Sequence, residues 1–103
     1  MLTHIVFWKL KDHAEGADKA TNLARAKALL ESCAKLTPGI QRFEVAIGEP
    51  GHEATYDLVL NSQFADAQAL AAYQKHPDHQ ALKPFMGAVV AARQCMDYSQ
   101  PAP

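Results

Sequence analysis

The chain has 103 residues, of which 49% are hydrophobic and 20% are charged, and its ten basic and eleven acidic side chains give a formal net charge of -1. This length is enough for one domain with one hydrophobic core and leaves no room for a second. A charge near zero without clustered Lys and Arg argues against nucleic-acid binding, which depends on neutralising phosphates. The longest apolar stretches, residues 5–8 and 86–92, are far shorter than the roughly 20 residues of a transmembrane helix, so we expect no membrane span.

The N-terminal residues carry no basic segment ahead of an apolar one, so we expect no signal peptide and a cytoplasmic location. The two cysteines, Cys33 and Cys95, are too few for a disulfide framework. We interpret both as free thiols that pack as small apolar residues in the core.

The first residues show the pattern of a β-strand. Residues 2–9 are rich in β-branched and aromatic side chains. Val6 and Trp8 share one face of this expected strand. Ile5 and Phe7 share the other, so the pattern predicts a strand that is covered on both faces.

A helix pattern follows. Between residues 14 and 36, apolar side chains recur at steps of three and four, which predicts one long helix with a single apolar stripe. The stripe consists of Leu23, Ala26, Leu30, Cys33 and Leu36. Pro38 and Gly39 then predict a tight turn, because proline fixes φ and glycine accepts positive φ. Alternating apolar and polar residues predict a second strand at residues 40–47.

The second half of the chain begins with a third expected strand at residues 56–61. Asp66 is placed to cap a short helix that ends before Pro77. Pro77 itself suits the first position of a further helical segment at residues 78–83, because its missing N–H would have no partner there in any case. Pro84 predicts the end of that segment.

Residues 86–98 predict the last strand, and the two prolines in residues 99–103 predict a loose C-terminal tail. The order β-α-β-β-α-β is typical of the ferredoxin-like α+β fold, a four-stranded antiparallel sheet with both helices on one face. The opposite face would then expose large apolar side chains from the first strand. Such a face usually marks an interface, so we expect a homodimer in which two sheets pack face to face.

Two polar side chains of the expected strands, His4 and Asp97, are candidates for a functional site. His4 shares its strand face with Val6 and Trp8, so its ring should point into an apolar layer, either as a core histidine with one hydrogen bond or as part of a site. Asp97, near the end of the last strand, is either a solvated strand end or the acceptor that orients a histidine and leaves its second nitrogen free.

The run from Tyr73 to His79 is the most unusual segment of the sequence. His76 precedes a proline and a helix, so it is either an N-cap or a packing residue. Tyr73 should be buried, its hydroxyl then needs a partner, and His79 could supply it. His76 and His79 together with His4 could hold a metal ion, but the sequence places no carboxylate or thiolate to complete the set, so we expect no metal.

These segments resemble the stress-responsive dimeric A/B barrel (Dabb) family. The resemblance rests on residues 2–9, the turn Pro38-Gly39-Ile40, the run at residues 56–60, the pattern Phe64-x-Asp66-x-x-x-Leu70-x-x-Tyr73-x-x-His76-Pro77-x-His79, and Asp97-Tyr98. It covers residues 2–98, the expected domain, and leaves residues 99–103 as the tail. It implies a ferredoxin-like protomer and a homodimer whose two sheets form an α/β barrel.

The family resemblance also implies where a site would lie. Members that act as polyketide cyclases use a tyrosine and a histidine in a cleft between sheet and helices, and the matching positions here are Tyr73 and His79. His4 and Asp97 match further residues of that pocket. Where the cyclases carry another pocket histidine, this chain has Leu58, so the cleft should be drier on that wall and the cyclase activity itself is not carried over.

Two functions remain open. In the first, the cleft binds or transforms a small aromatic or polyketide-like molecule without a cofactor: His79 moves a proton and Tyr73 donates a hydrogen bond to a carbonyl oxygen. The residues expected to contact the substrate are His4, Val6, Trp8, Leu58, His76 and Asp97. In the second, the protein is a non-catalytic dimeric stress-response domain and these side chains only close the core. An open cavity of at least about 300 Å³ beside Tyr73 and His79 would favour the first.

Overall fold

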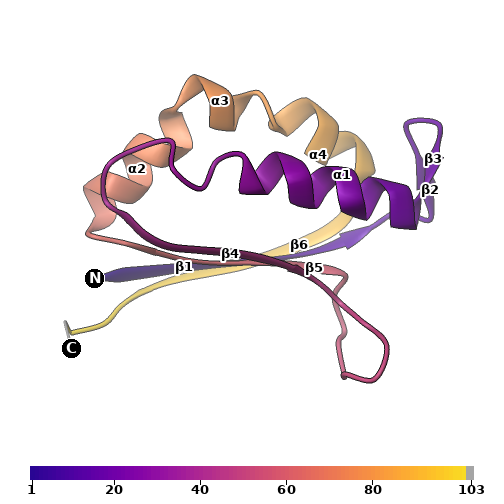
Figure 1. Cartoon of the computed structure of the whole chain (residues 1–103), viewed down its shortest axis with the longest axis horizontal. Coiled ribbons are helices and arrows are strands. Elements are labelled where there is room, and N and C mark those ends of the chain that lie inside the picture. Colours follow the sequence, from indigo (N-terminus) through magenta and orange to yellow (C-terminus); the bar gives the residue numbers. More distant parts are fainter. Residues whose placement is uncertain (102–103) are drawn as a thin grey trace.

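The computed structural model describes residues 1–101 and has two layers, a sheet and a set of helices on one of its faces (Figure 1). The four-stranded antiparallel sheet has the order β4-β5-β1-β6, with β1 (Leu2–Leu10), β4 (Ile40–Ile47), β5 (Leu58–Phe64) and β6 (Val90–Ser99). The helices are α1 (Lys19–Glu31), α2 (Ala67–Lys75), α3 (Pro77–Gln80) and α4 (Lys83–Val89), and a small hairpin joins β2 (His13–Ala14) to β3 (Ala17–Asp18). The predicted ferredoxin-like α+β fold is confirmed.

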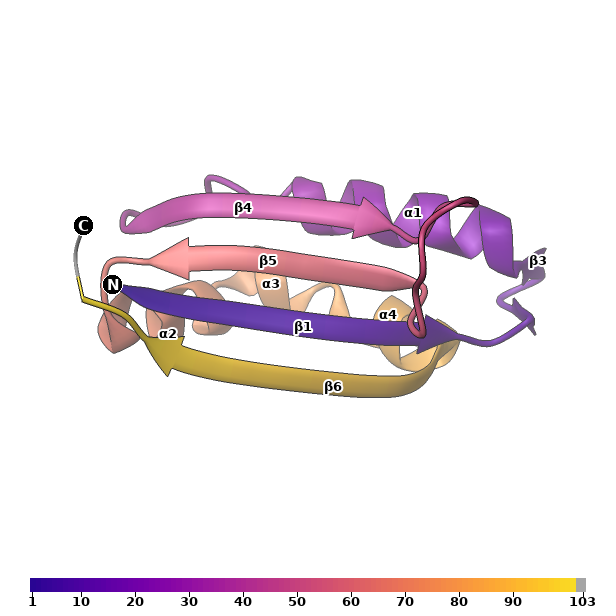
Figure 2. The same ribbon diagram turned by 90° about the horizontal axis from the view of Figure 1, so that it is seen from below.

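Strand β1 lies inside the sheet and divides its side chains between the two faces. His4, Val6 and Trp8 point toward the helices, with exposed fractions of 5%, 1% and 7%. Phe7 points to the other face and is 40% exposed. Figure 2 shows that face, which no helix covers. The sequence therefore predicted the two faces correctly, but only the inner one is covered within a single chain.

Helix α1 is shorter than the helix predicted over residues 14–36, because it begins at Lys19. Glu15 and Gly16 adopt φ values of 53° and 72°, which turn the chain through the small hairpin and cannot continue a helix. Asp18 then caps α1, its carboxylate accepting a hydrogen bond of 2.8 Å from the backbone N–H three residues later.

The predicted apolar stripe of α1 is confirmed, since Ala26 and Leu30 are buried against the sheet. The helix ends at Glu31, so Cys33 contributes to the core from the turn that follows. The expectation that both cysteines are buried is half right: Cys95, on the edge strand β6, is exposed.

The main departure from the predicted elements is α4. The apolar run from residue 86 starts inside this helix, and the last strand begins only at Val90. Pro84 lies in the first helical turn, where a missing N–H costs nothing, so it helps to begin a helix rather than ending one.

The C-terminal segment was predicted to be loose, but its first residues are held to β1. Ser99 is the last residue of β6, and the backbone N–H of Gln100 donates to the carbonyl of Met1 at 2.9 Å. The Thr3 hydroxyl donates to the Gln100 side-chain oxygen at 2.7 Å. Residues 102–103 of the predicted tail lie outside the described residues.

The turn between α1 and β4 is confirmed at Gly39, whose φ of +90° is unfavourable for other residues. A Cβ atom at this position would lie 2.8 Å from the Cβ atom of Ala69 in α2. Gly51 has a similar φ of +94°, but a Cβ atom there would meet nothing within 4 Å. The two glycines therefore share the backbone conformation and differ in packing.

We expect Gly51→Ala to lower the free energy of unfolding by about 1–2 kcal/mol through backbone strain alone. Gly39→Ala should lose that amount and about 1–3 kcal/mol more, because α2 must shift to admit the new methyl group. Urea denaturation of the two variants and the wild type measures both losses. Equal losses would mean that the contact between this turn and α2 does not constrain the fold.

Candidate functional site

A cavity of about 380 Å³ lies between the helices and the part of the sheet formed by β1, β5 and β6. Its walls are mostly apolar, with Val6 and Trp8 from β1, Leu60 from β5 and Leu30 from α1. The polar side chains that line it are His4, Tyr73, Gln74, His79, Lys83 and Arg93. An apolar cavity of this size with a few converging polar groups has the usual profile of a small-molecule site.

The more deeply buried of the two histidines in the cavity is His4. Its ring is nearly buried, and its Nδ1 atom lies 2.5 Å from Oδ1 of Asp97, which faces it across the pairing of β1 and β6. An ionised carboxylate only accepts hydrogen bonds, so this contact places a proton on Nδ1 and leaves Nε2 as the free nitrogen. Both interpretations of Asp97 hold: its side chain is 43% exposed near the end of β6, and its carboxylate orients a histidine.

His79, on α3, is the second histidine of the cavity. Its Nδ1 atom lies 3.2 Å from the backbone carbonyl of Gln74, which can only accept, so Nδ1 carries the proton here as well. Burial lowers the pKa of His79, and the nearby charges of Lys83 and Arg93 lower it further, while the Gln74 contact works in the opposite direction. The ring is therefore held in the neutral form with its Nε2 free to accept a proton.

Tyr73, on α2, packs against both the core and His79. Its ring centre lies 4.6 Å from that of His79 and 5.2 Å from that of Phe64. The side chain is fully buried, and its hydroxyl has no hydrogen-bond partner among the described residues, so the predicted bond to His79 is not formed. Burial raises the pKa of Tyr73 well above its ordinary value, so the hydroxyl stays protonated and can donate.

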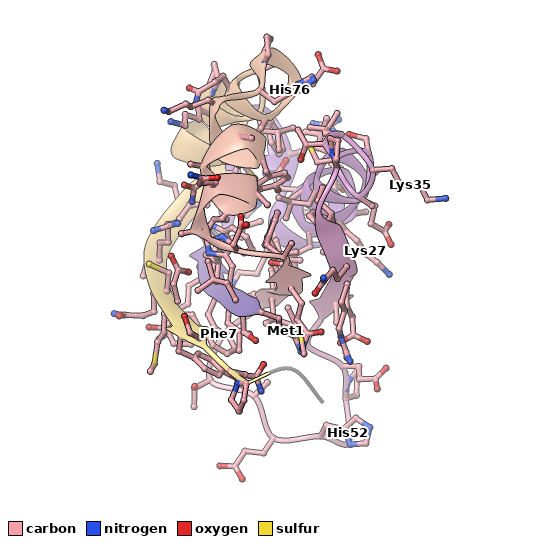
Figure 3. The ribbon with its side chains drawn as sticks, turned by 90° about the vertical axis from the view of Figure 1, so that its left-hand side faces the viewer. Met1, Phe7, Lys27, Lys35, His52 and His76 are labelled. Atoms are coloured by element: carbon pink, nitrogen blue, oxygen red, sulfur yellow. The ribbon has the colours of Figure 1, made fainter. Side chains whose placement is uncertain are left out.

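The structure therefore brings together most of the predicted site residues but not all of them. Leu58 is buried in the core and does not line this cavity, so the expectation that it forms a dry wall of the cleft is wrong; it borders the larger hollow instead. His76 caps α3 by accepting a hydrogen bond of 3.1 Å from the backbone N–H of Asp78, and it does not line the cavity. It lies at the outer edge of the helical layer (Figure 3). Asp97 lies behind His4 rather than on the cavity wall.

The cavity has further lining residues that were not predicted from the sequence, among them Gln74, Lys83, Met86 and Arg93. Arg93 could have been found, because strand alternation places it on the same face of β6 as Asp97. Lys83 and Met86 could not, since the sequence predicts the end of a helical segment at Lys83 and a strand at Met86, whereas both residues belong to α4.

No group of three His, Cys, Asp or Glu side chains within residues 1–101 is arranged to hold a metal ion. No helix in the same range is long and apolar enough to cross a membrane. A larger hollow of about 550 Å³ lies on the open face of the sheet, between Phe7 and the loop that joins β4 to β5. That loop extends below the sheet, on the side away from the helices (Figure 1).

Comparison with known proteins places the chain in a family. The family model described as the stress responsive A/B barrel domain (Dabb) matches residues 2–100. The chain belongs to the Dabb family. An uncharacterized protein of Streptomyces coelicolor is 33% identical to this Dabb chain over 81 residues, which are 79% of this chain and 81% of that protein.

Solved structures give the same assignment for the fold. A dimeric protein of unknown function with a ferredoxin-like fold from Bacteroides fragilis superposes with a TM-score of 0.79 at 27% identity, over 96% of this chain and 95% of its own. A Dabb family protein from Mesorhizobium loti superposes with a TM-score of 0.72 at 23% identity, over 98% and 97% of the two chains. The recognised family and the ferredoxin-like fold are both confirmed.

The lowered pKa of His79 predicts how stability depends on pH. Because the folded protein disfavours the protonated ring, the unfolded chain binds more protons once the pH falls below the ordinary value of about 6.5. The contribution of His79 to stability is therefore complete above that pH and is lost on acidification toward the lower pKa of the folded state. Urea denaturation between about pH 7 and about pH 5 should show a steeper decline for the wild type than for His79→Gln.

The same prediction can be checked directly by NMR titration of the imidazole nitrogens. We expect His79 to titrate below about pH 6.5 and to carry its proton on Nδ1 when neutral. A midpoint above this value, or a proton on Nε2, would contradict the geometry described for the ring.

Proposed function

We propose that this Dabb protein binds a small aromatic or polyketide-like carbonyl compound in the cavity and moves a proton at the carbon next to the carbonyl group. The observation that carries the proposal is the contact of 2.5 Å between His4 and Asp97, with the His4 ring on the wall of an apolar cavity. A carboxylate that fixes the tautomer of a histidine and stabilises its protonated form is a recurrent way of making a general base.

The volume of the cavity supports this proposal over a purely structural role. At about 380 Å³ it lies within the range of small-molecule sites. In a domain whose polar residues only closed the core, Tyr73 and His79 would be expected to fill this space and to satisfy each other. Instead the Tyr73 hydroxyl has no partner, and each histidine of the cavity keeps one ring nitrogen free.

The roles proposed for the three side chains follow from their protonation states. His4 Nε2 takes the proton from carbon, and Asp97 stabilises the imidazolium that forms. Negative charge then develops on the carbonyl oxygen, which needs a neutral donor, and the Tyr73 hydroxyl is a donor that no protein group uses. His4 returns the proton at the end of the reaction, so the chemistry needs no oxidant or reductant. His79, held neutral, is the second acceptor in the cavity.

Binding is tested by thermal shift with small hydroxyaromatic acids and aromatic polyketides. At about ten times Kd, a ligand should stabilise the protein by about 1.4 kcal/mol and raise the Tm by several degrees. The shift should vanish in the double variant Tyr73→Phe/His79→Ala. If no compound shifts the wild type, the non-catalytic dimer is the better account.

Proton transfer is tested by deuterium exchange into the methyl group of hydroxyacetophenone, followed by NMR in heavy water. We expect exchange with the wild type to exceed that in buffer, and to fall by about 10²- to 10⁴-fold in His4→Gln while binding persists. His13→Gln removes an exposed histidine on β2 and is the matched control, which should exchange as the wild type does. Exchange that survives in His4→Gln would rule out His4 as the base.

We also propose that two copies pair through the open face of the sheet. Of the large apolar side chains that are exposed, Phe7, Met96 and Tyr98 lie on β1 and β6 with side chains on this face. The larger hollow beside Phe7 would be covered by the second copy. The related structure from Bacteroides fragilis is described as dimeric, which supports the same arrangement here.

Size-exclusion chromatography of two matched variants tests the interface. Phe7→Glu should elute at the size of one chain, because a charge at the centre of an apolar interface loses its hydration without a partner. Leu29→Glu is the control: Leu29 is 36% exposed, close to the 40% of Phe7, but it lies on α1 in the helical layer. Elution of Phe7→Glu as a dimer would place the interface elsewhere.

A further inference from the structure

Three basic side chains lie at the opening of the cavity. A second hollow of about 290 Å³ adjoins the cavity, and the two share Gln74, His79, Lys83 and Arg93. Lys83 and Arg93 are exposed, so the cavity opens to solvent at this point. Lys75, at the end of α2, lines the outer hollow as well. We call Lys75, Lys83 and Arg93 the basic mouth.

No acidic side chain among the described residues pairs with the basic mouth. No Asp or Glu lines the cavity or the outer hollow. None of the ion pairs within residues 1–101 involves a residue of the basic mouth. In a chain with one more acidic than basic residue, three basic side chains at one opening without an acid make a local positive potential.

Arg93 is held over the edge strand but keeps most of its donors free. Its Nη1 atom donates to the Cys95 sulfur at 3.5 Å, and thiol sulfur is a weak acceptor. The acid on the same face of β6 is Asp97, four residues away and thus about 13 Å along the strand, where it is hydrogen-bonded to His4. The guanidinium is therefore free to bind a planar anion such as a carboxylate with two parallel hydrogen bonds.

We propose that the ligand of the cavity carries a carboxylate, which binds at the basic mouth between Lys83 and Arg93 while its apolar part lies against Val6, Trp8 and Leu60. This inference rests on the proposed function, because it takes the same cavity as the binding site. It narrows the substrate class to an aromatic or polyketide-like acid. It also fixes the direction of the ligand, with the anionic end outward and the reacting carbon toward His4.

The test compares a naphthalenecarboxylate with the matched naphthalenecarboxamide, which has the same shape and no charge. We expect the acid to bind the wild type about tenfold more tightly than the amide at about 0.01 M salt, and this preference to shrink at about 1 M salt. In Lys83→Gln/Arg93→Gln the two affinities should become nearly equal, because the affinity for the acid falls and the affinity for the amide does not change. NMR titration gives both Kd values.

Lys35→Gln is the matched control, since Lys35 points away from the molecule on the side opposite β6 (Figure 3). It removes one positive charge outside the basic mouth, so the preference for the acid should persist. A second readout is the pKa of His79, which the acid should raise and the amide should not, because a bound anion offsets the charges of Lys83 and Arg93.

The outcomes separate this inference from the proposed function. If acid and amide bind the wild type equally, the anion subsite is wrong and the cavity remains a binding site. If the preference for the acid persists in Lys83→Gln/Arg93→Gln, the carboxylate binds elsewhere. The anion subsite is then wrong, and the cavity remains a binding site. If neither compound binds the wild type, the inference is overturned together with binding in the cavity.

Discussion

The pairing of β1 with β6 is the constraint on which the rest of this molecule depends. The register sets His4 opposite Asp97, Val6 opposite Cys95 and Trp8 opposite Arg93. Side chains that face each other across an antiparallel pair lie on the same side of the sheet, so this one register creates the His4–Asp97 contact and places Arg93 at the rim. A slip by one residue would send Asp97 and Arg93 to the open face and leave a nearly buried imidazole without its acceptor. The hydrogen bonds that Gln100 forms with the start of the chain fix the far end of the same register.

Much of the fold was accessible from local sequence pattern. The alternation in residues 2–9 separated the two faces of β1, and Asp66 was recognised as a cap, which its 2.8 Å bond to the Ala69 N–H confirms. Local pattern failed where two conformations suit the same residues. The apolar run after Pro84 is short enough for either a strand or a helix, and helical packing against the sheet decides in favour of α4. The start of α1 was missed because Glu15, a residue without turn preference, takes a positive φ.

The sequence predicted which residues form the candidate site better than it predicted the contacts between them. His4, Tyr73 and His79 were named from strand alternation, from helix spacing and from the family resemblance, and all three line the cavity. The partner of His4 could not be assigned, because it comes from the other end of the chain and depends on a register that no local pattern specifies. His76 was predicted to contact the substrate because it lies close to Tyr73 and His79 in the sequence, but its ring caps α3. The proposed general base is accordingly His4 rather than His79, because only His4 is hydrogen-bonded to a carboxylate.

The buried hydroxyl of Tyr73 lowers the stability of the empty protein but would be useful for binding a ligand. A polar group that is removed from water without a partner costs the folded state about 1–3 kcal/mol. A phenylalanine would fit the same aromatic packing against Phe43 and Phe64 without that cost. The empty protein thus carries a local defect in its own core, and a domain kept only for its shape would gain by repairing it. Under the proposed function, a bound molecule would supply the missing acceptor and offset this cost, so occupancy of the cavity would stabilise the helical layer as well as fill the space.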